Sequence, residues 1–367
     1  MLTQPGARPI IIAGHGVELA RAESQLLQFA ERHNLPVVNT ILGMGTFPQN
    51  HPQWYGMIGM HGEAATNYAV DQANVVIGIG SRFDDRITGS LPEFIANKTF
   101  VHFEVDGSEI GKIVPTAVPL VGDLDHTLKR ANTLLTAHQF ASWWETLTEL
   151  KRQYSFLQLP KYNGTQLSQP HVVNMISNIT VGKAIVASDV GRHQMWVSRF
   201  YRFAQSHSHL SAGGLGSMGY GIPAAMGAAL GNPGREVWAI VGDGGFMMNV
   251  QELATLAEHN IPVKIVVMAD GVLGMVHQWQ ALLFNQNYSS IHLHNPDFYK
   301  LAEAFNIPAW SVTKMSELEK VINNARTVVG PTLIVCKVDP HQNIFPMVPP
   351  NTALRDQALN AEKIYVK

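Results

Sequence analysis

The sequence has little charge and almost no cysteine. Lys, Arg, Asp and Glu make up 15% of the 367 residues, and 26 basic residues stand against 28 acidic ones, a formal net charge of −2. Without a basic excess, the chain has no electrostatic footprint for nucleic acid or for an anionic membrane surface. The single cysteine, Cys336, cannot form an internal disulfide, which favours a cytoplasmic protein.

The sequence also lacks long apolar segments. The first eight residues do not have the charged-then-apolar order of a signal peptide. An uncharged run over 210–233 is interrupted by glycines and by two prolines. We therefore predict a packed loop and helix there, not a membrane span.

What the sequence does contain is an alternation of short β-branched runs with helical patterns, which is typical of parallel βαβ units. A helix is expected after the first strand, with Leu19, Ala22, Leu26 and Phe29 on one face, and another over 140–154. The fold class is therefore α/β, with two doubly wound domains and mainly parallel sheets. The predicted strands are 9–13, 36–40, 75–80, 99–105, 117–121, 184–188, 236–241, 263–268 and 332–338.

A domain boundary is expected over 157–170, a stretch with two prolines, a glycine and no periodicity. We predict one domain over 1–160 and a second over 161–345. An irregular arm over 346–367 would then lie on the surface.

The most informative stretch is Gly242-Asp243-Gly244-Gly245, directly after a predicted strand. Glycine amides and a helix start favour a bound phosphate, and Asn249 with Glu252 resembles a capping box. Asp270 comes 27 residues after Asp243, behind the next strand, so both carboxylates should reach one sheet edge. Such a pair suits Mg²⁺. The alternative is that both aspartates are ordinary turn residues.

Several segments together resemble the large subunits of acetohydroxyacid (acetolactate) synthases, a family of thiamine-diphosphate enzymes. They are DVGRHQMW (189–196), GGLGSMGYGIPAAMGA (213–228), GDGGFMMNVQELATLAEHNIPVKIVVMADGVLGMVHQWQ (242–280), GMHG (59–62), SRFDDRITG (81–89) and PMVPP (346–350). The resemblance implies a flavin-type central domain and a thiamine-diphosphate domain. The implied reaction is decarboxylation of pyruvate followed by addition to pyruvate or 2-oxobutanoate.

In the second half, the resemblance implies that Asp243, Asp270 and the carbonyl of Val272 bind Mg²⁺. Met218, Met275 and Trp279 would face cofactor or substrate, although core packing is the simpler interpretation of such residues without the resemblance. The other residues implied to bind thiamine diphosphate are Gly191, Arg192, His193, Gly216, Gly242, Gly244, Gly245 and Gly274.

Two positions depart from the family, which usually has Gln where this chain has Arg192 and Asn where it has Asp270. An added anion disfavours a bound diphosphate and an added cation favours it. We therefore hypothesise that the two changes compensate electrostatically.

In the first half, Gly14-His15-Gly16 is half of a dinucleotide fingerprint, and a plain strand-to-helix turn explains it equally well. The 82–86 cluster is either a solvated ion-pair loop or, by the resemblance, a site where Arg86 binds the carboxylate of the second oxoacid. The resemblance also implies a structural FAD, lined by Gly14, His15, Gly16, Thr40, Met60, His61, Gly80, Ser81, Arg82, Asp84, Glu104, Val105, Gly122 and Asp123.

The family's first domain, which binds the pyrimidine ring, has no counterpart among these motifs. The resemblance therefore implies either a separate pyrimidine-binding-domain chain or a truncated enzyme, as well as a homo-oligomer and a small regulatory subunit. The alternative is an inactive cofactor-binding or regulatory homologue.

Overall fold

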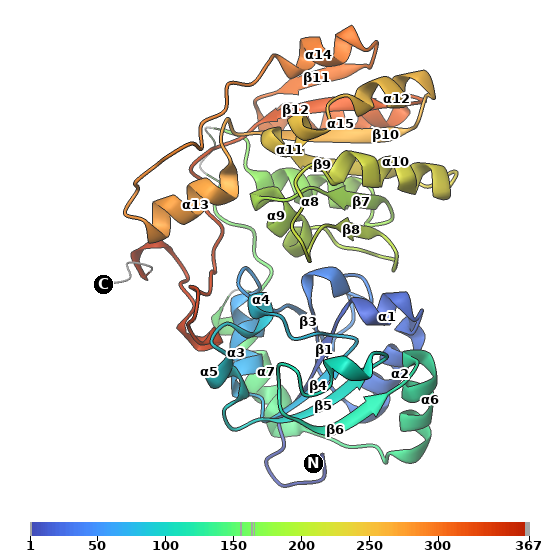
Figure 1. The fold of residues 1–367 in the computed structure, drawn as a ribbon, viewed down its shortest axis with the longest axis vertical. Coiled ribbons are helices and arrows are strands. Elements are labelled where there is room, and N and C mark those ends of the chain that lie inside the picture. Colours follow the sequence, from blue (N-terminus) through green and yellow to red (C-terminus); the bar gives the residue numbers. More distant parts are fainter. Residues whose placement is uncertain (1, 155, 163, 165, 364–367) are drawn as a thin grey trace. The chain divides into compact units, whose positions relative to one another are not determined.

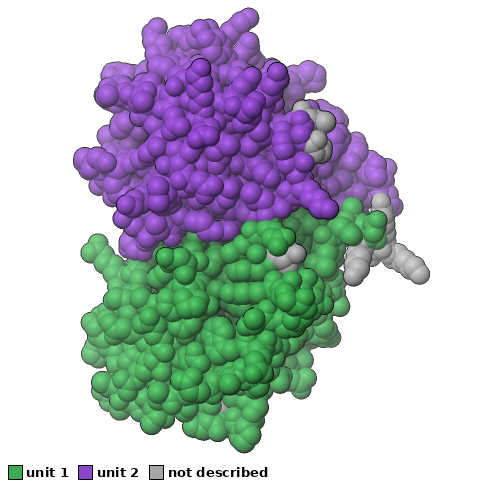
Figure 2. Space-filling view, turned by 180° about the vertical axis from the view of Figure 1, so that it is seen from behind, with its two compact units in different colours: residues 1–158, 345–364 green, residues 159–344, 365–367 purple. Residues whose placement is uncertain are grey.

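The chain folds into two compact units, which Figure 2 colours separately. The computed structural model describes residues 2–154, 156–162, 164 and 166–363. Unit 1 comprises residues 1–158 and 345–364, and unit 2 comprises residues 159–344. Each unit contains a six-stranded sheet in which the neighbouring strands are parallel. The α/β prediction with doubly wound parallel sheets is therefore confirmed.

The sheet of unit 1 has the strand order β3-β2-β1-β4-β5-β6 (Figure 1). Its strands are β1 (Pro9–Ala13), β2 (Val37–Asn39), β3 (Trp54–Met57), β4 (Val75–Ile79), β5 (Thr99–Glu104) and β6 (Thr116–Val121). Helices α2 and α6 pack together, and α3 packs with α7. The helices are α1 (His15–Leu19), α2 (Glu23–His33), α3 (Ala64–Gln72), α4 (Asp85–Thr88), α5 (Leu91–Ile95), α6 (Leu124–Leu134) and α7 (Ala141–Gln153), with 3₁₀ turns η1 (Ile41–Gly43), η2 (Gly107–Glu109), η3 (Leu354–Asp356) and η4 (Ala361–Lys363).

The single helix predicted after β1 is wrong, because the chain forms α1 and α2 with a break between them. Arg21 has a φ of 53°, a left-handed conformation that ends the first helix. Leu19 is consequently 73% exposed, whereas Ala22, Leu26 and Phe29 are buried as predicted.

The C-terminal segment is partly buried within unit 1 and is not a surface arm. Met347, Val348 and Ala358 are buried. The Val348 amide donates to the Met60 carbonyl at 2.8 Å, and Asn67 donates to the Gln357 side chain at 3.1 Å. These contacts attach residues far apart in the sequence to the same unit.

The sheet of unit 2 has the strand order β11-β12-β10-β9-β7-β8 (Figure 1). Its strands are β7 (Ile185–Ser188), β8 (His209–Ser211), β9 (Val237–Gly242), β10 (Val263–Ala269), β11 (Ala309–Val312) and β12 (Thr332–Lys337). The central strands β9 and β10 are buried because they consist almost wholly of apolar residues. The helices are α8 (Gln169–Ile179), α9 (Arg192–Phe200), α10 (Gly221–Gly231), α11 (Asp243–Met248), α12 (Glu252–Glu258), α13 (Gly274–Leu283), α14 (Phe298–Ala304) and α15 (Met315–Thr327).

Two local predictions in unit 2 have different outcomes. The uncharged run forms a loop and the helix α10, as predicted. The capping box is wrong, since α12 has Gln251 at its N-cap and no side-chain cap bond. Asn249 instead donates to the Gly219 carbonyl at 2.6 Å. No helix in the described part of the chain is long and apolar enough to cross a membrane.

Candidate functional site

The candidate site of unit 2 lies where the strand order reverses, between β7 and β9. Asp189 follows β7, Asp243 follows β9 directly, and Asp270 follows β10. Ligands of doubly wound sheets bind outside the carboxyl ends of the strands at such a point. The topology therefore brings the predicted residues of three separate segments to one edge.

Asp243 is a buried carboxylate, 1% exposed, that is held by neutral donors among the described residues. Its Oδ1 accepts from the Gly244 amide at 2.9 Å, and its Oδ2 accepts from the Gly271 amide at 2.7 Å. Asn295 also donates to Oδ2, at 2.8 Å. Burial, followed by the nearby Asp270 carboxylate, raises the pKa of Asp243 to about 6.

Asp270 forms an ion pair with Arg192, whose Nη2 lies 2.7 Å from its Oδ2. The two side chains are 7% and 1% exposed. Gln169 donates to the same oxygen at 3.4 Å, and the Val272 amide donates to Oδ1 at 3.2 Å. Arg192 and Asp270, the two positions at which we expect a departure from the family, are thus in direct contact, which is a condition of the compensation hypothesis.

The surroundings of Arg192 and His193 contain polar nitrogens without partners in the described part of the chain. These are Arg192 Nε and His193 Nε2, both buried. The His193 ring lies about 3 Å from a Cβ built at Gly191 or at Gly242, so both glycines leave room for it. Burial lowers the pKa of His193. Unsatisfied buried nitrogens are rare in folded proteins, and here they fit a ligand rich in oxygen atoms such as a diphosphate.

Asp189, which the motif analysis quoted but did not assign, organises the loop that carries Met218. Its carboxylate accepts from the amides of Val190 at 2.7 Å, Gly219 at 3.0 Å and Gly221 at 2.9 Å. A Cβ at Gly245 would lie 2.5 Å from Asp189 Oδ1. Asp189 therefore ties the end of β7 to the loop before α10 and to the turn after β9.

The apolar residues predicted for this site lie on two elements. The Met218 Cε is 3.4 Å from a Cβ built at Gly244, so Met218 covers the turn after β9. Met275 and Trp279 lie one turn apart on α13 and are half-buried. Gly216 lies in the Met218 loop with a φ of 66°.

The site contains the two carboxylates of Asp243 and Asp270, and no group of three or more His, Cys, Asp or Glu gathers as a metal site in the described residues. Oxygen ligands of this kind suit Mg²⁺ when a substrate phosphate supplies further oxygens. Gln169 and Asn295 were not predicted. They contact Asp270 and Asp243 from 101 and 52 residues away in sequence, so no local motif marks them.

In unit 1, the glycines of the half fingerprint serve the packing of the backbone. The Gly14 amide donates to the Ile79 carbonyl at 2.9 Å, and the Gly16 amide donates to the Gly80 carbonyl at 3.0 Å. A Cβ at Gly14 would lie 2.2 Å from the Gly80 carbonyl oxygen. The amides of Gly14 and Gly16 are thus not free to hold a diphosphate, which favours the plain strand-to-helix turn.

The other residues predicted for FAD lie around the carboxyl ends of the same sheet. Ser81 is buried with an Oγ that has no partner among the described residues. Glu104 accepts from the amide of Val105 at 2.9 Å, and Val105 is exposed. The side chains of Thr40, Asp84 and Asp123 cap the elements that follow them, and His15 lies 3.8 Å from Glu18. Ser81 and the exposed Arg82 could contact a polar ligand. The amides of Gly14 and Gly16 could not, because they already donate to carbonyls.

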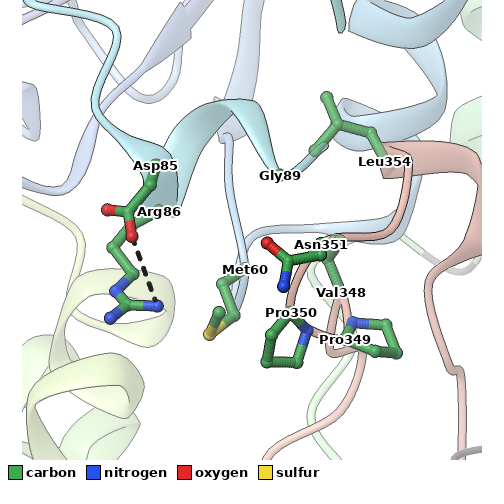
Figure 3. Close-up of a pocket in the computed structure, with 9 residues that line it drawn as sticks. All are labelled: Met60, Asp85, Arg86, Gly89, Val348, Pro349, Pro350, Asn351 and Leu354. Carbon is green, nitrogen blue, oxygen red and sulfur yellow. Dashed lines mark ion pairs between the residues drawn. The ribbon is translucent and has the colours of Figure 1, made fainter. Parts of the chain in front are cut away.

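Arg86 lies in the first turn of α4, beside a small cavity of about 50 Å³ within unit 1. Its side chain is 61% exposed and lies 3.8 Å from Asp85. Figure 3 shows Arg86 on one side of Met60 and the segment with Pro350 and Asn351 on the other. The guanidinium is therefore available to an anion, with an exposed carboxylate as its close ion-pair partner.

Comparison with known proteins matches two models of one enzyme family to the chain. The central domain of the thiamine pyrophosphate enzymes matches residues 4–131, and their C-terminal TPP binding domain matches residues 189–336.

Similar proteins come from archaea, plants and bacteria. A probable acetolactate synthase large subunit of Methanocaldococcus jannaschii is 39% identical over 95% of this chain and 60% of its own length. Acetolactate synthase 2, chloroplastic, of Zea mays is 37% identical over 97% of this chain and 57% of its own. The acetolactate synthase large subunit of Haemophilus influenzae is 35% identical over 96% of this chain and 63% of its own.

Proposed function

Since the chain belongs to the thiamine pyrophosphate enzymes, of which it contains the central and the C-terminal TPP-binding domain, we propose that it acts in an acetolactate synthase-type carboligase. Its substrates would be pyruvate and a second 2-oxoacid, either pyruvate or 2-oxobutanoate. The chain spans about 60% of the length of the curated relatives it matches, so the activity of the whole enzyme is part of this proposal.

The observation that carries the proposal is the pair of buried carboxylates, Asp243 and Asp270, beside unpartnered nitrogens of Arg192 and His193. Such a site can bind a metal ion and the diphosphate that shares it. We assign Mg²⁺ to Asp243, Asp270 and the Val272 carbonyl. The diphosphate would lie against Arg192 and His193.

When bound, thiamine diphosphate supplies the electron sink that allows a 2-oxoacid to lose CO₂. The residues of this chain would bind and orient the cofactor and the substrates. Met218, held by the loop that Asp189 fixes, would support the bent cofactor. Met275 and Trp279 would line the substrate pocket from α13. Arg86 would bind the carboxylate of the second oxoacid, which a guanidinium can hold through two hydrogen bonds.

FAD is proposed for unit 1, with Ser81 and Arg82 as the polar contacts that support it. Because the amides of Gly14 and Gly16 are already used, the diphosphate of FAD would need other donors. The flavin absorbance of the purified protein tests this proposal, since loss of that absorbance in Ser81→Val with an unchanged fold would support it. A colourless protein that takes up no added FAD would contradict it.

We further propose a homo-oligomer in the cytoplasm with a small regulatory subunit, in which a pyrimidine-binding domain outside residues 1–367 completes the site. In this proposal, residues of the present two domains anchor the metal and the diphosphate, and the pyrimidine-binding domain supplies proton transfer to the pyrimidine ring. The second candidate function is an inactive homologue that only binds the cofactor, which the charged Arg192–Asp270 pair would also suit.

Titration calorimetry with thiamine diphosphate and Mg²⁺ tests the proposal, and a pyruvate assay separates the two candidates. Asp243→Ala should abolish cofactor binding. Asp297→Asn is the matched control, because Asp297 caps α14 in the same unit and is exposed. Binding without pyruvate consumption, even with a pyrimidine-binding-domain chain added, would favour the inactive homologue. No binding by the unaltered chain would refute both.

A further inference from the structure

The Arg192–Asp270 pair is fixed from both sides inside unit 2. Arg192 Nη2 contacts Asp270 at 2.7 Å, while its Nη1 donates to the carbonyls of Pro340 at 2.7 Å and Gln342 at 3.3 Å. The guanidinium therefore cannot leave Asp270 without abandoning two main-chain acceptors. A surface pair would exchange freely with water, but this one is buried, so its geometry is held.

The helix that follows leaves space for this pair. Gly274 begins α13, and a Cβ at this position would lie 2.6 Å from Arg192 Nε and 3.0 Å from Asp270 Oδ2. Any other residue at 274 would push the guanidinium or the carboxylate out of place. The backbone at Gly274 thus leaves the space that the Arg192–Asp270 contact occupies.

The charges at the site are unequal. Asp243 and Asp270 contribute two carboxylates, whereas Arg192 contributes one cation, and it faces Asp270. Asp243 accepts from neutral amides and from Asn295 within the described part. Among the described residues, Asp243 therefore has no cationic partner, whereas Asp270 is paired with Arg192.

We propose that Arg192 is a positioning residue that competes with the metal for Asp270 and at the same time presents a built-in cation to the diphosphate. This inference rests on the proposed function. The Arg192 guanidinium would have two opposite effects. It lowers the affinity of the site for a divalent metal alone and raises the affinity of the site for the diphosphate alone. If the role of Arg192 were purely structural, replacing it would weaken both affinities.

The test uses the full chain with Arg192→Gln, Asp270→Asn, the double variant and Arg192→Lys. Binding of Mn²⁺ alone is followed by electron paramagnetic resonance, and binding of thiamine diphosphate without divalent metal by calorimetry. Arg192→Gln should bind Mn²⁺ at least about tenfold more tightly, about 1.4 kcal/mol, and thiamine diphosphate more weakly. Arg192→Lys, which keeps the charge, should stay close to the unaltered chain in Mn²⁺ affinity.

The double variant measures the coupling directly. Asp270→Asn should reduce Mn²⁺ affinity at least about tenfold more in the Arg192→Gln background than in the unaltered chain, because in that background Arg192 no longer competes with the metal for Asp270. Equal losses in both backgrounds, or no gain of Mn²⁺ affinity in Arg192→Gln, would overturn the inference. Since Gln and Asn leave no unpaired charge, the double variant also keeps the test open if a single variant does not fold.

The Arg326–Glu236 pair, at 2.8 Å on the same unit, provides the matched control. Arg326→Gln with Glu236→Gln should leave both affinities unchanged. The two proposals fail separately: absence of thiamine diphosphate binding with Mg²⁺ present refutes the proposed function, whereas the Mn²⁺ comparison decides the role of Arg192 without the cofactor.

Discussion

Replacing Asp243 with Asn should stabilise the metal-free chain at neutral pH while abolishing metal binding. Burial and Asp270 raise the pKa of Asp243 from 3.8 to about 6. Holding this carboxylate ionised in the folded state therefore costs about 3 kcal/mol, at about 1.4 kcal/mol for each pH unit of the difference. Asn carries no charge and removes that cost.

The hydrogen bonds of Asp243 reduce the gain. Its carboxylate accepts from Gly244, Gly271 and Asn295, and an amide oxygen turned toward the last two loses the bond from Gly244. That loss costs about 1 kcal/mol. The net gain is about 2 kcal/mol, which corresponds to about 4–8 °C in Tm for a unit of this size.

The gain must depend on pH, with a sign that the linkage relation fixes. Because the pKa of Asp243 is raised, the folded chain binds more protons than the unfolded chain between about pH 4 and about pH 6. The contribution of Asp243 to stability is therefore present at low pH and is lost as the pH rises through about 6. The advantage of Asp243→Asn should be absent near about pH 4 and complete above about pH 7.

Thermal unfolding of the metal-free full chain across this range measures the effect, with calorimetry to confirm that Mg²⁺-dependent binding of thiamine diphosphate is lost. Asp297→Asn again serves as the control, since Asp297 is exposed. A lower Tm for Asp243→Asn at neutral pH, or a gain that does not change between low and neutral pH, would refute the reasoning.

Three further predictions concern other buried contacts. Asp189→Asn should weaken thiamine diphosphate binding about tenfold and expose the Met218 loop to proteolysis, because at least one of three amide bonds is lost; unchanged cleavage would contradict this. Gly245→Ala should destabilise the chain by about 1–3 kcal/mol through its clash with Asp189, whereas Gly227→Ala, on open helix surface, should stabilise it by about 0.5 kcal/mol in urea unfolding. Burial lowers the pKa of Lys151 from the ordinary lysine value of 10.5 to about 8, so its acylation, followed by mass spectrometry, should reach half its maximal rate near pH 8; a midpoint near 10.5 would show the burial effect to be absent.

The strands were predictable where a β-branched run fills a buried central position. β1 and β10 are of this kind, and their predicted bounds agree with the structure to within one residue. β3 was missed because it is short and contains Gly56, whose φ of 86° suits no ordinary strand residue. The break between α1 and α2 was also missed, since nothing in the apolar spacing marks the left-handed Arg21.

The strand topology made it predictable that Asp243 and Asp270 lie at one edge of the sheet. Helices α11 and α12 and strand β10 separate Asp243 from Asp270, and parallel pairing of β9 with β10 brings the two aspartates to one edge. The partners of these carboxylates were not predictable. Asn295 and the carbonyl of Pro340 lie in loops and Gln169 lies at the start of α8, and their positions follow from the packing of the whole unit.

The two glycine motifs of the chain differ in the way their polar groups are satisfied. In unit 1, the amides of Gly14 and Gly16 donate to neighbouring carbonyls, so these two amides are not available to a ligand. In unit 2, the glycine turn after β9 adjoins His193, whose buried Nε2 has no partner in the described part of the chain. Since buried polar groups are almost always paired in folded proteins, the unpartnered His193 nitrogen beside the second motif favours a ligand there. Sequence spacing presents both as strand-to-helix turns with glycines, and the distinction emerges only when each donor is traced to its acceptor.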